Sequence, residues 1–241
     1  MLAIRINDAL KKKIISFNQI FLHVCFLRWL KYIIPVEIVH LNKKQYLHKS
    51  DRPLMVIANH NSAWDPFLIF STMDEEFFLG HCPWRLPVYH SFFEKFYFRW
   101  LLKFAGTYSI KPLGSLEKSL QKTFEILQDG SNTIFFPEGE RVRGGEKSGP
   151  KRGIGHIINE MSVLIMPVYI HYSNYEASGF GSIRQRTKII FGEVTDSEYF
   201  LENWSDNHHN AVMDCVWSLR DRDANINSDG NRKHKSQTIK K

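Results

Sequence analysis

A histidine and an aspartate five residues apart have the side chains that acid–base chemistry needs. They are His60 and Asp65, in the segment Asn-His-Asn-Ser-Ala-Trp-Asp-Pro at residues 59–66. At this spacing on one helix, two residues lie about 140° apart and cannot share a face. They can meet if His60 lies in a turn and Asp65 in the first turn of the next helix. The carboxylate would then hold one ring nitrogen while the other accepts a proton from a hydroxyl group.

The same two residues also fit a purely structural role. Asp-Pro is a common helix start, with Asp65 as the N-cap and Pro66 at N1, the first helical position. His60 would then be a hydrogen-bonded turn residue. Taken alone, this segment leaves both interpretations open.

A second charged turn occupies residues 135–141, Phe-Phe-Pro-Glu-Gly-Glu-Arg. Proline and glycine on either side of Glu138 indicate a tight turn that also holds Arg141. A guanidinium group there suits a phosphate or a carboxylate, although a solvated charged loop is the simpler alternative. The loop that follows is cationic, with Arg143, Lys147, Lys151 and Arg152.

Both charged turns follow predicted strands. Residues 54–58 (LMVIA) are short, apolar and bounded by Pro53 and Asn59, and residues 133–136 precede the second turn. In open α/β sheets, ligands bind outside the carboxyl ends of the strands. Two charged turns at one sheet edge therefore favour a functional site over a solvated surface.

Strands and helices alternate along the rest of the chain. The other predicted strands are 76–80, 107–110, 163–170 and 187–194, and the predicted helices are 90–104, 115–129, 152–160 and 197–219. This order predicts one α/β domain over residues 51–221, with a mixed, largely parallel central sheet flanked by helices and preceded by an amphipathic N-terminal helix.

Charge separates the two ends of the chain from its body. The 241 residues carry a net charge of +7, distributed as +7 over residues 1–50, −4 over 51–221 and +4 over 222–241. A nucleic-acid binder would carry its excess of positive charge on the folded surface, so we expect no nucleic-acid partner. Basic ends on an acidic body instead fit an anionic membrane. The polar residues 222–241 are predicted to form a disordered basic tail.

The cysteines and the overall composition limit the remaining classes. Hydrophobic residues make up 43% of the chain, which excludes a wholly disordered protein. Cys25, Cys82 and Cys215 are scattered, so they indicate neither a metal site nor a disulfide framework and favour a reducing compartment.

The N-terminal 50 residues contain an amphipathic pattern. The 14 residues between Lys13 and Arg28 are too few to span a bilayer, which needs about 20, and no cleavage site follows them. They predict a helix lying in the membrane interface. The alternative is a core helix packed on the domain, and both can hold for different faces of the helix. Its periodic apolar residues are Ile14, Phe17, Phe21, Val24 and Leu27, and the face is widened by Ile20, Trp29, Leu30 and Ile33. The flanking basic residues are Lys11, Lys12, Lys13, Arg28 and Lys31.

The order of these segments resembles the glycerolipid acyltransferase family typified by 1-acyl-sn-glycerol-3-phosphate acyltransferase. That family carries N-H-x-S-x-x-D, matched by residues 59–65, and F-P-E-G-[TS]-R, matched by residues 136–141. A hydrophobic strand that ends in a proline is matched by residues 163–168, with Pro167, and a K-x-G element is matched by residues 151–153. The resemblance covers residues 50–195.

The resemblance implies an O-acyltransferase on the cytoplasmic face of a membrane, peripheral or monotopic, that acts on a lyso-lipid acceptor. His60 would be the general base and Asp65 would orient it. Acyl-CoA or acyl carrier protein would be the co-substrate, with no acyl-enzyme, no cofactor and no metal. The residues that would bind the acceptor's polar head, or otherwise contact substrate, are Glu138, Gly139, Arg141, Lys111 and Pro167.

The chain departs from the family pattern at two positions. Pro112 stands where an arginine of the second block, roughly G-x-x-F-I-x-R, is expected, although Lys111 precedes it. Glu140 replaces the usual threonine or serine and adds negative charge. The acceptor is therefore 1-acylglycerol-3-phosphate, a lyso-phospholipid without a terminal phosphate, or a lyso-aminolipid.

Two other functional classes compete with a transferase. A non-catalytic lipid-binding protein could keep the same fold, but it would not need both His60 and Asp65. A serine hydrolase would carry G-x-S-x-G, which is missing, so Ser62 is interpreted as a cap or turn residue. Metal-dependent hydrolysis would need more ligands than this pair provides.

Overall fold

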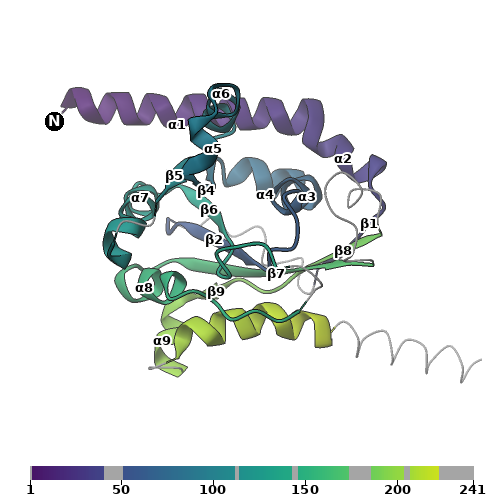
Figure 1. Cartoon of the computed structure of the whole chain (residues 1–241). Helices are drawn as coiled ribbons and strands as arrows, with labels where there is room; N and C mark the ends of the chain where they lie inside the picture. Colours follow the sequence, from purple (N-terminus) through teal and green to yellow (C-terminus); the bar gives the residue numbers. More distant parts are fainter. Residues whose placement is uncertain are drawn as a thin grey trace, which may run out of the picture.

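A central sheet with helices on both faces forms the body of the protein (Figure 1). The computed structural model describes residues 2–40, 51–111, 114–142, 146–173, 186–203 and 207–222. Within these residues the sheet has seven strands in the order β1-β8-β7-β2-β6-β3, with β9 paired to β7. The strands are β1 (Val36–His40), β2 (Leu54–Ala58), β3 (Trp84–Arg85), β6 (Asn132–Phe135), β7 (Leu164–Tyr172), β8 (Thr187–Phe191) and β9 (Thr195–Asp196).

The pairing of the strands confirms a mixed, largely parallel sheet. β2 lies between β6 and β7 and is parallel to both, whereas β7 is antiparallel to β8 and to β9. In the register, Ile57 pairs with Phe135 of β6 and with Pro167 of β7. The carboxyl ends of β2, β6 and β7 therefore reach the same edge of the sheet.

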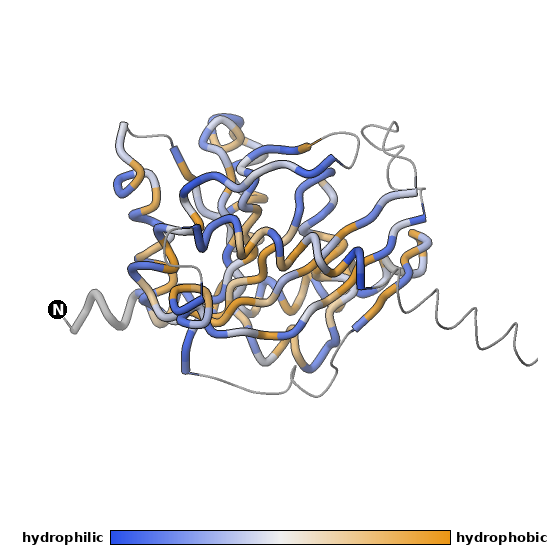
Figure 2. The backbone as a smooth tube through the Cα atoms, turned by 90° about the horizontal axis from the view of Figure 1, so that it is seen from below, coloured by the Kyte–Doolittle hydropathy of each residue, from blue (hydrophilic) through white to orange (hydrophobic). Residues whose placement is uncertain are grey.

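Strand β2 is buried at every position and divides the core into two clusters. Leu54, Val56 and Ala58 belong to the cluster on one face, and Met55 and Ile57 belong to the cluster on the other. This alternation follows from the pleat of a strand, which turns successive side chains to opposite faces. The backbone coloured by hydropathy shows the most apolar segments running through the middle of the molecule (Figure 2).

Helices cover both faces of the sheet (Figure 1). The first core cluster includes residues of α2, α3 and α4, and the second includes residues of α7, α8, α9 and a helical stretch at 208–222. The helices are α1 (Leu2–Leu22), the π-helical turn η1 (His23–Leu27), α2 (Arg28–Ile33), α3 (Asp65–Thr72), α4 (Glu75–Gly80), α5 (His90–Glu94), α6 (Phe96–Phe104), α7 (Leu116–Gln128), α8 (Gly153–Glu160) and α9 (Ser197–Asn203).

The predicted strand at residues 76–80 is wrong, because this segment is helix α4. The Asp74 carboxylate accepts a hydrogen bond from the backbone N–H of Glu76 at 3.0 Å and caps the helix. Glu75 and Glu76 add acidic side chains to the first turn, where the helix dipole favours them. Phe77 and Phe78 are buried, and such a short apolar run does not by its pattern distinguish a strand from a helix.

Several other segments differ in detail from the prediction. The predicted helix at 90–104 is two helices, α5 and α6, which meet at Lys95 in an extended conformation. The predicted strand at 107–110 is β5 (Tyr108–Ile110), which pairs with β4 (Pro87–Tyr89) in a separate two-stranded sheet. The central seven-stranded sheet also includes β1, which lies within the predicted N-terminal segment of residues 1–50. The predicted tail lies outside the described residues from 223 onward.

Helix α1 is attached to the domain by a buried glutamine. Gln19 accepts a hydrogen bond from Trp84 N at 2.8 Å and donates to the backbone oxygens of Ala105, at 2.9 Å, and Trp84. Gly106 has a φ of +83°, and a Cβ on it would lie only 2.6 Å from the Gln19 amide nitrogen. Both the turn and the close approach of the helix therefore require glycine at position 106.

The opposite side of the N-terminal helix is exposed, as the amphipathic pattern predicted. Ile14, Phe17, Phe21 and Val24 are all exposed, whereas Leu27 and Leu30 belong to the core and were wrongly placed on the same face. Among the described helices, none is both long enough and apolar enough to cross a membrane. One side of the segment thus packs on the domain and the other faces outward.

Replacing Gln19 with alanine should destabilise the protein by about 1–3 kcal/mol, because it leaves buried backbone groups of Trp84 without partners. Urea denaturation would measure the free energy of unfolding. The control is Asn18→Ala, which truncates the neighbouring half-exposed amide and should cost much less. Equal effects of the two substitutions would contradict the anchoring role.

Candidate active site

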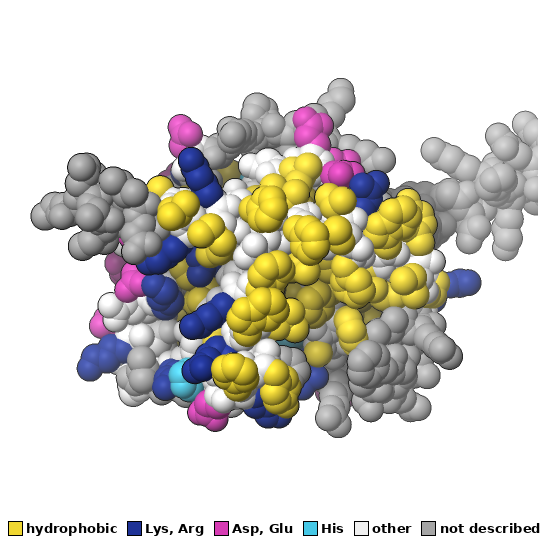
Figure 3. Space-filling view, turned by 90° about the horizontal axis from the view of Figure 1, so that it is seen from above, with side chains coloured by type: hydrophobic (Ala, Val, Ile, Leu, Met, Phe, Trp, Pro, Cys, Tyr) yellow, Lys and Arg dark blue, Asp and Glu magenta, His cyan; other side chains and the backbone are white. Residues whose placement is uncertain are grey.

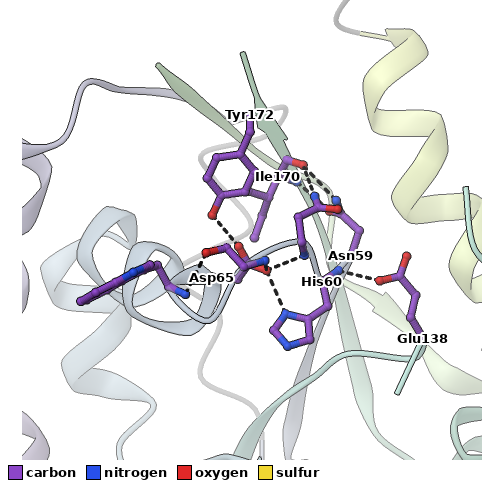
Figure 4. Close-up of polar contacts among 9 residues, drawn as sticks. Asn59, His60, Asp65, Glu138, Ile170 and Tyr172 are labelled. Carbon is purple, nitrogen blue, oxygen red and sulfur yellow. Dashed lines mark hydrogen bonds and ion pairs between the residues drawn. The ribbon is translucent and has the colours of Figure 1, made fainter. Parts of the chain in front are cut away.

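The turn after β2 is attached to β7 by the side chain of Asn59. Its Oδ1 accepts a hydrogen bond from Ile170 N at 2.7 Å, and its Nδ2 donates to Ile170 O at 2.9 Å (Figure 4). The side-chain amide therefore forms the pair of hydrogen bonds with Ile170 that the backbone of a neighbouring strand would otherwise form. Asn59 is 1% exposed. This pairing fixes the point at which the chain leaves the sheet and so positions His60.

His60 and Asp65 meet, with His60 in the turn and Asp65 at the start of α3, which is the arrangement that their spacing allows. The His60 Nδ1 atom lies 2.8 Å from Asp65 Oδ2, and the ring stacks on Phe136 with centroids 4.1 Å apart. The His60 side chain is 19% exposed and that of Asp65 is 0% exposed. The second ring nitrogen, Nε2, faces away from the carboxylate (Figure 4).

The Asp65 carboxylate binds the turn before it and does not cap α3. Trp64 is the N-cap residue, and Asp65 Oδ2 accepts hydrogen bonds from Asn61 N at 2.7 Å and Ser62 N at 2.8 Å. The prediction of Asp65 as the N-cap is therefore wrong: Trp64 holds that position, and its side chain forms no cap hydrogen bond. Together with His60, these donors compensate for burying the charge and hold the turn in one conformation.

Tyr172 is a site residue that the sequence analysis missed. Its hydroxyl donates a hydrogen bond to Asp65 Oδ1 at 2.5 Å, so the second carboxylate oxygen is also occupied (Figure 4). The predicted strand ended at residue 170, two residues before this tyrosine. The position of its strand could have indicated Tyr172, because the carboxyl end of β7 lies at the same sheet edge as that of β2, where His60 follows.

Glu138 lies beneath His60 and not on an open surface. Its Oε2 accepts a hydrogen bond from His60 N at 2.7 Å, and the residue is 1% exposed. Its other oxygen, Oε1, is buried without a hydrogen-bond partner among the described residues. Burial raises the pKa of this carboxyl from 4.5 to about 7, and the nearby negative charge of Asp65 adds to the shift. The His60 N–H bond acts in the opposite direction.

The loop after Glu138 also wraps around His60. Val142 N donates to His60 O at 2.8 Å, which places the backbone of the exposed Arg141 beside the histidine. Gly139 has a φ of +71°, and its carbonyl accepts a hydrogen bond from the Tyr89 hydroxyl at 2.8 Å. The structure therefore brings the two charged turns together at one edge of the sheet.

Among the described residues, the other predicted residues form no hydrogen bond or ion pair with His60 or Asp65. Lys111 is exposed after β5, and Pro167 is buried in the middle of β7, opposite Ile57. Lys147 lies over the ring of Trp217, 6.0 Å from its centroid, in the direction of the C-terminal helical stretch. Lys151 forms an ion pair with Glu140 at 3.0 Å.

This arrangement can supply a positioned base. Because Nδ1 is held by a carboxylate, the Nε2 atom of His60 is the nitrogen that can take a proton from a hydroxyl. Ser62 Oγ accepts a hydrogen bond from Trp64 N at 3.2 Å, which fits its predicted role as a turn residue. In the part of the chain that the structure describes, no three His, Cys, Asp or Glu side chains gather closely enough to hold a metal ion.

Glu138 should make the stability of the protein depend on pH. A carboxyl with a raised pKa binds its proton more tightly in the folded state, so its contribution to the free energy of unfolding falls as the pH rises from 4.5 to about 7. Glu138→Gln keeps an acceptor for His60 N and cannot ionise. Its stability relative to wild type should therefore increase by roughly 2–3 kcal/mol between pH 5 and pH 8.

Urea denaturation at several pH values would measure this difference. Glu140→Gln is the matched control, because its carboxylate is exposed and its relative stability should change little over the same range. A flat difference for Glu138→Gln would show that this carboxyl is not held in its neutral form.

Known proteins share the sequence and the fold around this site. The family model described as Acyltransferase matches residues 38–171, more than half of the chain. The chloroplastic 1-acyl-sn-glycerol-3-phosphate acyltransferase LPAT1 of Arabidopsis thaliana is 23% identical over 139 residues, 56% of this chain and 36% of that protein. The corresponding BAT2 enzyme of Brassica napus is 25% identical over 125 residues, 51% of this chain and 34% of its own length. The matched region thus spans about a third of these curated relatives.

A solved structure has a similar fold over nearly the whole chain. The 1-acyl-sn-glycerophosphate (LPA) acyltransferase PlsC of Thermotoga maritima superposes with a TM-score of 0.59, covering 90% of this chain and 98% of that one at 15% identity. Both motif turns, His60 with Asp65 and Glu138 with Arg141, fall within the residues that the family model matches. The chain therefore belongs to the acyltransferase family.

Proposed function

We propose that this protein is a membrane-associated O-acyltransferase. It moves a fatty acyl group from the thioester of acyl-CoA or acyl carrier protein to the hydroxyl of a lyso-lipid, 1-acylglycerol-3-phosphate or a related molecule. The observation that carries the proposal is the His60–Asp65 pair at 2.8 Å, which leaves Nε2 unbound by the carboxylate. Membership of the acyltransferase family supports the same reaction class.

The proposed reaction is a single displacement. His60 Nε2 takes the proton from the acceptor hydroxyl as its oxygen attacks the thioester carbonyl carbon. The tetrahedral intermediate collapses, the carbon–sulfur bond breaks, and the proton on His60 passes to the departing thiolate. The products are an oxygen ester and a free thiol. The charge of Asp65 stabilises the imidazolium that exists between the two proton transfers.

The polar head of the acceptor would lie near the exposed Arg141. A guanidinium can bind a phosphate through two parallel hydrogen bonds, and the backbone next to Arg141 contacts His60. The unusual Glu140 is paired with Lys151 at 3.0 Å, so its negative charge is partly compensated. Lys111 would assist if the head group extends toward β5. Glu138, being buried, would act by positioning His60 rather than by touching the head group.

Helix α1 would hold the enzyme on the membrane surface. Its outward side carries Phe17 and Phe21, which are 70% and 52% exposed, and Lys11 and Lys13 lie on the same helix. An amphipathic helix with aromatic residues and lysines binds in the interface plane of anionic bilayers. Because Gln19 ties α1 to the domain, the site would be held near its lipid substrates on the cytoplasmic face.

His60→Ala should lower acyl transfer by about 10²-fold or more, because the general base is lost. The assay follows labelled acyl groups from acyl-CoA and from acyl carrier protein to a panel of lyso-lipids in mixed micelles. His156→Ala is the matched control, since this histidine of α8 packs on Phe124. Full activity in His60→Ala would refute the assignment of the base. Vesicle binding by a wild-type protein that acylates none of the acceptors would favour the non-catalytic lipid-binding alternative.

Tyr172→Phe should lower kcat by about tenfold while KM changes less than twofold. The phenol bonds to Asp65, and the loss of its hydroxyl leaves Asp65 Oδ1 buried without this donor and frees the carboxylate to move. Tyr108→Phe is the control, because it also removes a buried hydroxyl, one that is bonded to Thr123 at 3.0 Å. Both variants should lose comparable stability, so equal losses of kcat would show that Tyr172 has no special link to catalysis.

A further inference from the structure

The apolar surface around α1 continues onto helix α6. Phe96, Tyr97 and Trp100 are 78%, 67% and 69% exposed, which is unusual for side chains of this size. Viewed from above, hydrophobic side chains cover a large part of this face, with lysine and arginine side chains along its edge (Figure 3). Nothing in the proposed reaction uses these aromatic residues. Contiguous apolar surface of this kind marks an interaction site.

The order of residues in α6 places the aromatic groups on one side. Phe96 and Trp100 are one turn apart, and Tyr97 and Leu101 follow at the same spacing. Arg99 and Lys103 lie along one edge of this side, and the Arg99 guanidinium is 5.9 Å from the centroid of the Phe96 ring. The helix therefore presents an aromatic stripe with a basic border to the outside.

Helices α1 and α6 lie beside each other on top of the domain (Figure 1). The amide of Gln19 on α1 donates to the carbonyl of Ala105 at the end of α6, at 2.9 Å. The exposed sides of both helices therefore belong to one rigid face, although they come from separate parts of the sequence. We call this face, made of Ile14, Phe17, Phe21, Phe96, Tyr97 and Trp100, the α1–α6 surface.

We propose that the α1–α6 surface is a composite membrane-docking site, in which α6 inserts Phe96, Tyr97 and Trp100 into the interface of an anionic bilayer. Tryptophan and tyrosine favour the head-group level, where one end of the side chain is apolar and the other is hydrated. The lysines and arginines beside them complement anionic lipids. The occupant is thus a lipid surface, and the inference extends the proposed function, on which its biological meaning rests.

The docking surface is also connected to the catalytic turn. Tyr89 directly precedes α5, which leads into α6, and its hydroxyl donates to the carbonyl of Gly139 at 2.8 Å. Gly139 lies next to Glu138, which holds His60. Insertion of α6 would therefore set the distance between the membrane and the loop that carries the proposed head-group residues.

Vesicle sedimentation tests the docking surface directly. The combined variant Phe96→Ser, Tyr97→Ser and Trp100→Ser should partition at least tenfold less onto vesicles of phosphatidylcholine with about one-third phosphatidylglycerol. The control variant, Leu116→Ser with Tyr199→Ser, changes exposed apolar residues on α7 and α9 and should partition like wild type. Unchanged binding of the α6 variant would overturn the proposal.

A conservative variant gives a second, independent readout. Lipids with brominated acyl chains quench tryptophans that enter the bilayer, so Trp100→Phe should lose a distinct quenched component while it still binds vesicles. An identical degree of quenching in wild type and Trp100→Phe would show that Trp100 stays outside the lipid. Sedimentation equilibrium that shows a dimer which the α6 triple variant abolishes would instead assign the surface to a second copy of the chain.

Short-chain substrates separate this inference from the proposed reaction. With a monomeric, water-soluble lyso-lipid and a short acyl-CoA, the α6 variant should keep wild-type turnover, because its base is intact. With vesicle-embedded acceptor its rate should fall in parallel with binding. If wild type binds vesicles through α6 but transfers no acyl group to either acceptor, the reaction is refuted and the docking surface is supported.

Discussion

The carboxylate of Asp65 is fully buried, and this constraint organises the site. A buried charge is costly unless hydrogen-bond donors surround it. Four groups meet this need: the His60 ring, the backbone N–H groups of Asn61 and Ser62, and the hydroxyl of Tyr172. Each donor is thereby held in place, so the same contacts that stabilise the charge also fix the orientation of the proposed base.

The parallel arrangement around β2 makes this cluster possible. Asn59 pairs the turn with β7 on one side, and Glu138 binds His60 N from the loop after β6 on the other. The turn is therefore held from both neighbouring strands at the edge where their carboxyl ends meet. A proposed base held in this way would change little in position when substrates bind and leave, which favours rapid proton transfer.

The outer surface follows a different rule from the interior. Gln19 attaches the amphipathic helix α1 to the domain through hydrogen bonds to backbone groups. The aromatic residues of α1 therefore remain on its exposed side. The same contacts bring α1 against the end of α6. The orientation of the domain toward a lipid surface would then be set by hydrogen bonds within the protein, and the affinity by the exposed aromatic and basic side chains.

The sequence alone determined the elements and the chemistry that depend on local pattern. The uniformly apolar residues 54–58 predicted a buried strand, the amphipathic residues 115–129 predicted α7, and the motifs at 59–65 and 136–141 predicted the paired turns. Local pattern failed at residues 76–80, where the short apolar run Phe-Phe-Leu fits a strand or a helix. The cap formed by Asp74 and the packing of Phe77 and Phe78 on the core decided for the helix. Local pattern also placed Leu27 and Leu30 on the outer face, because periodicity shows that a helix has two sides but not how wide the buried one is.

What the tertiary structure decided is the environment of each charged side chain. No pattern within the sequence joins Tyr172 to Asp65, since the two residues are 107 positions apart in the chain and meet through strand order. Likewise, a glutamate in a Pro-Glu-Gly turn looks exposed, and only the fold shows that Glu138 is buried against the backbone of His60 with a raised pKa. The physical reason is that residue type and spacing determine which chemistry is available, whereas burial and hydrogen-bond partners arise from segments that are distant in the chain.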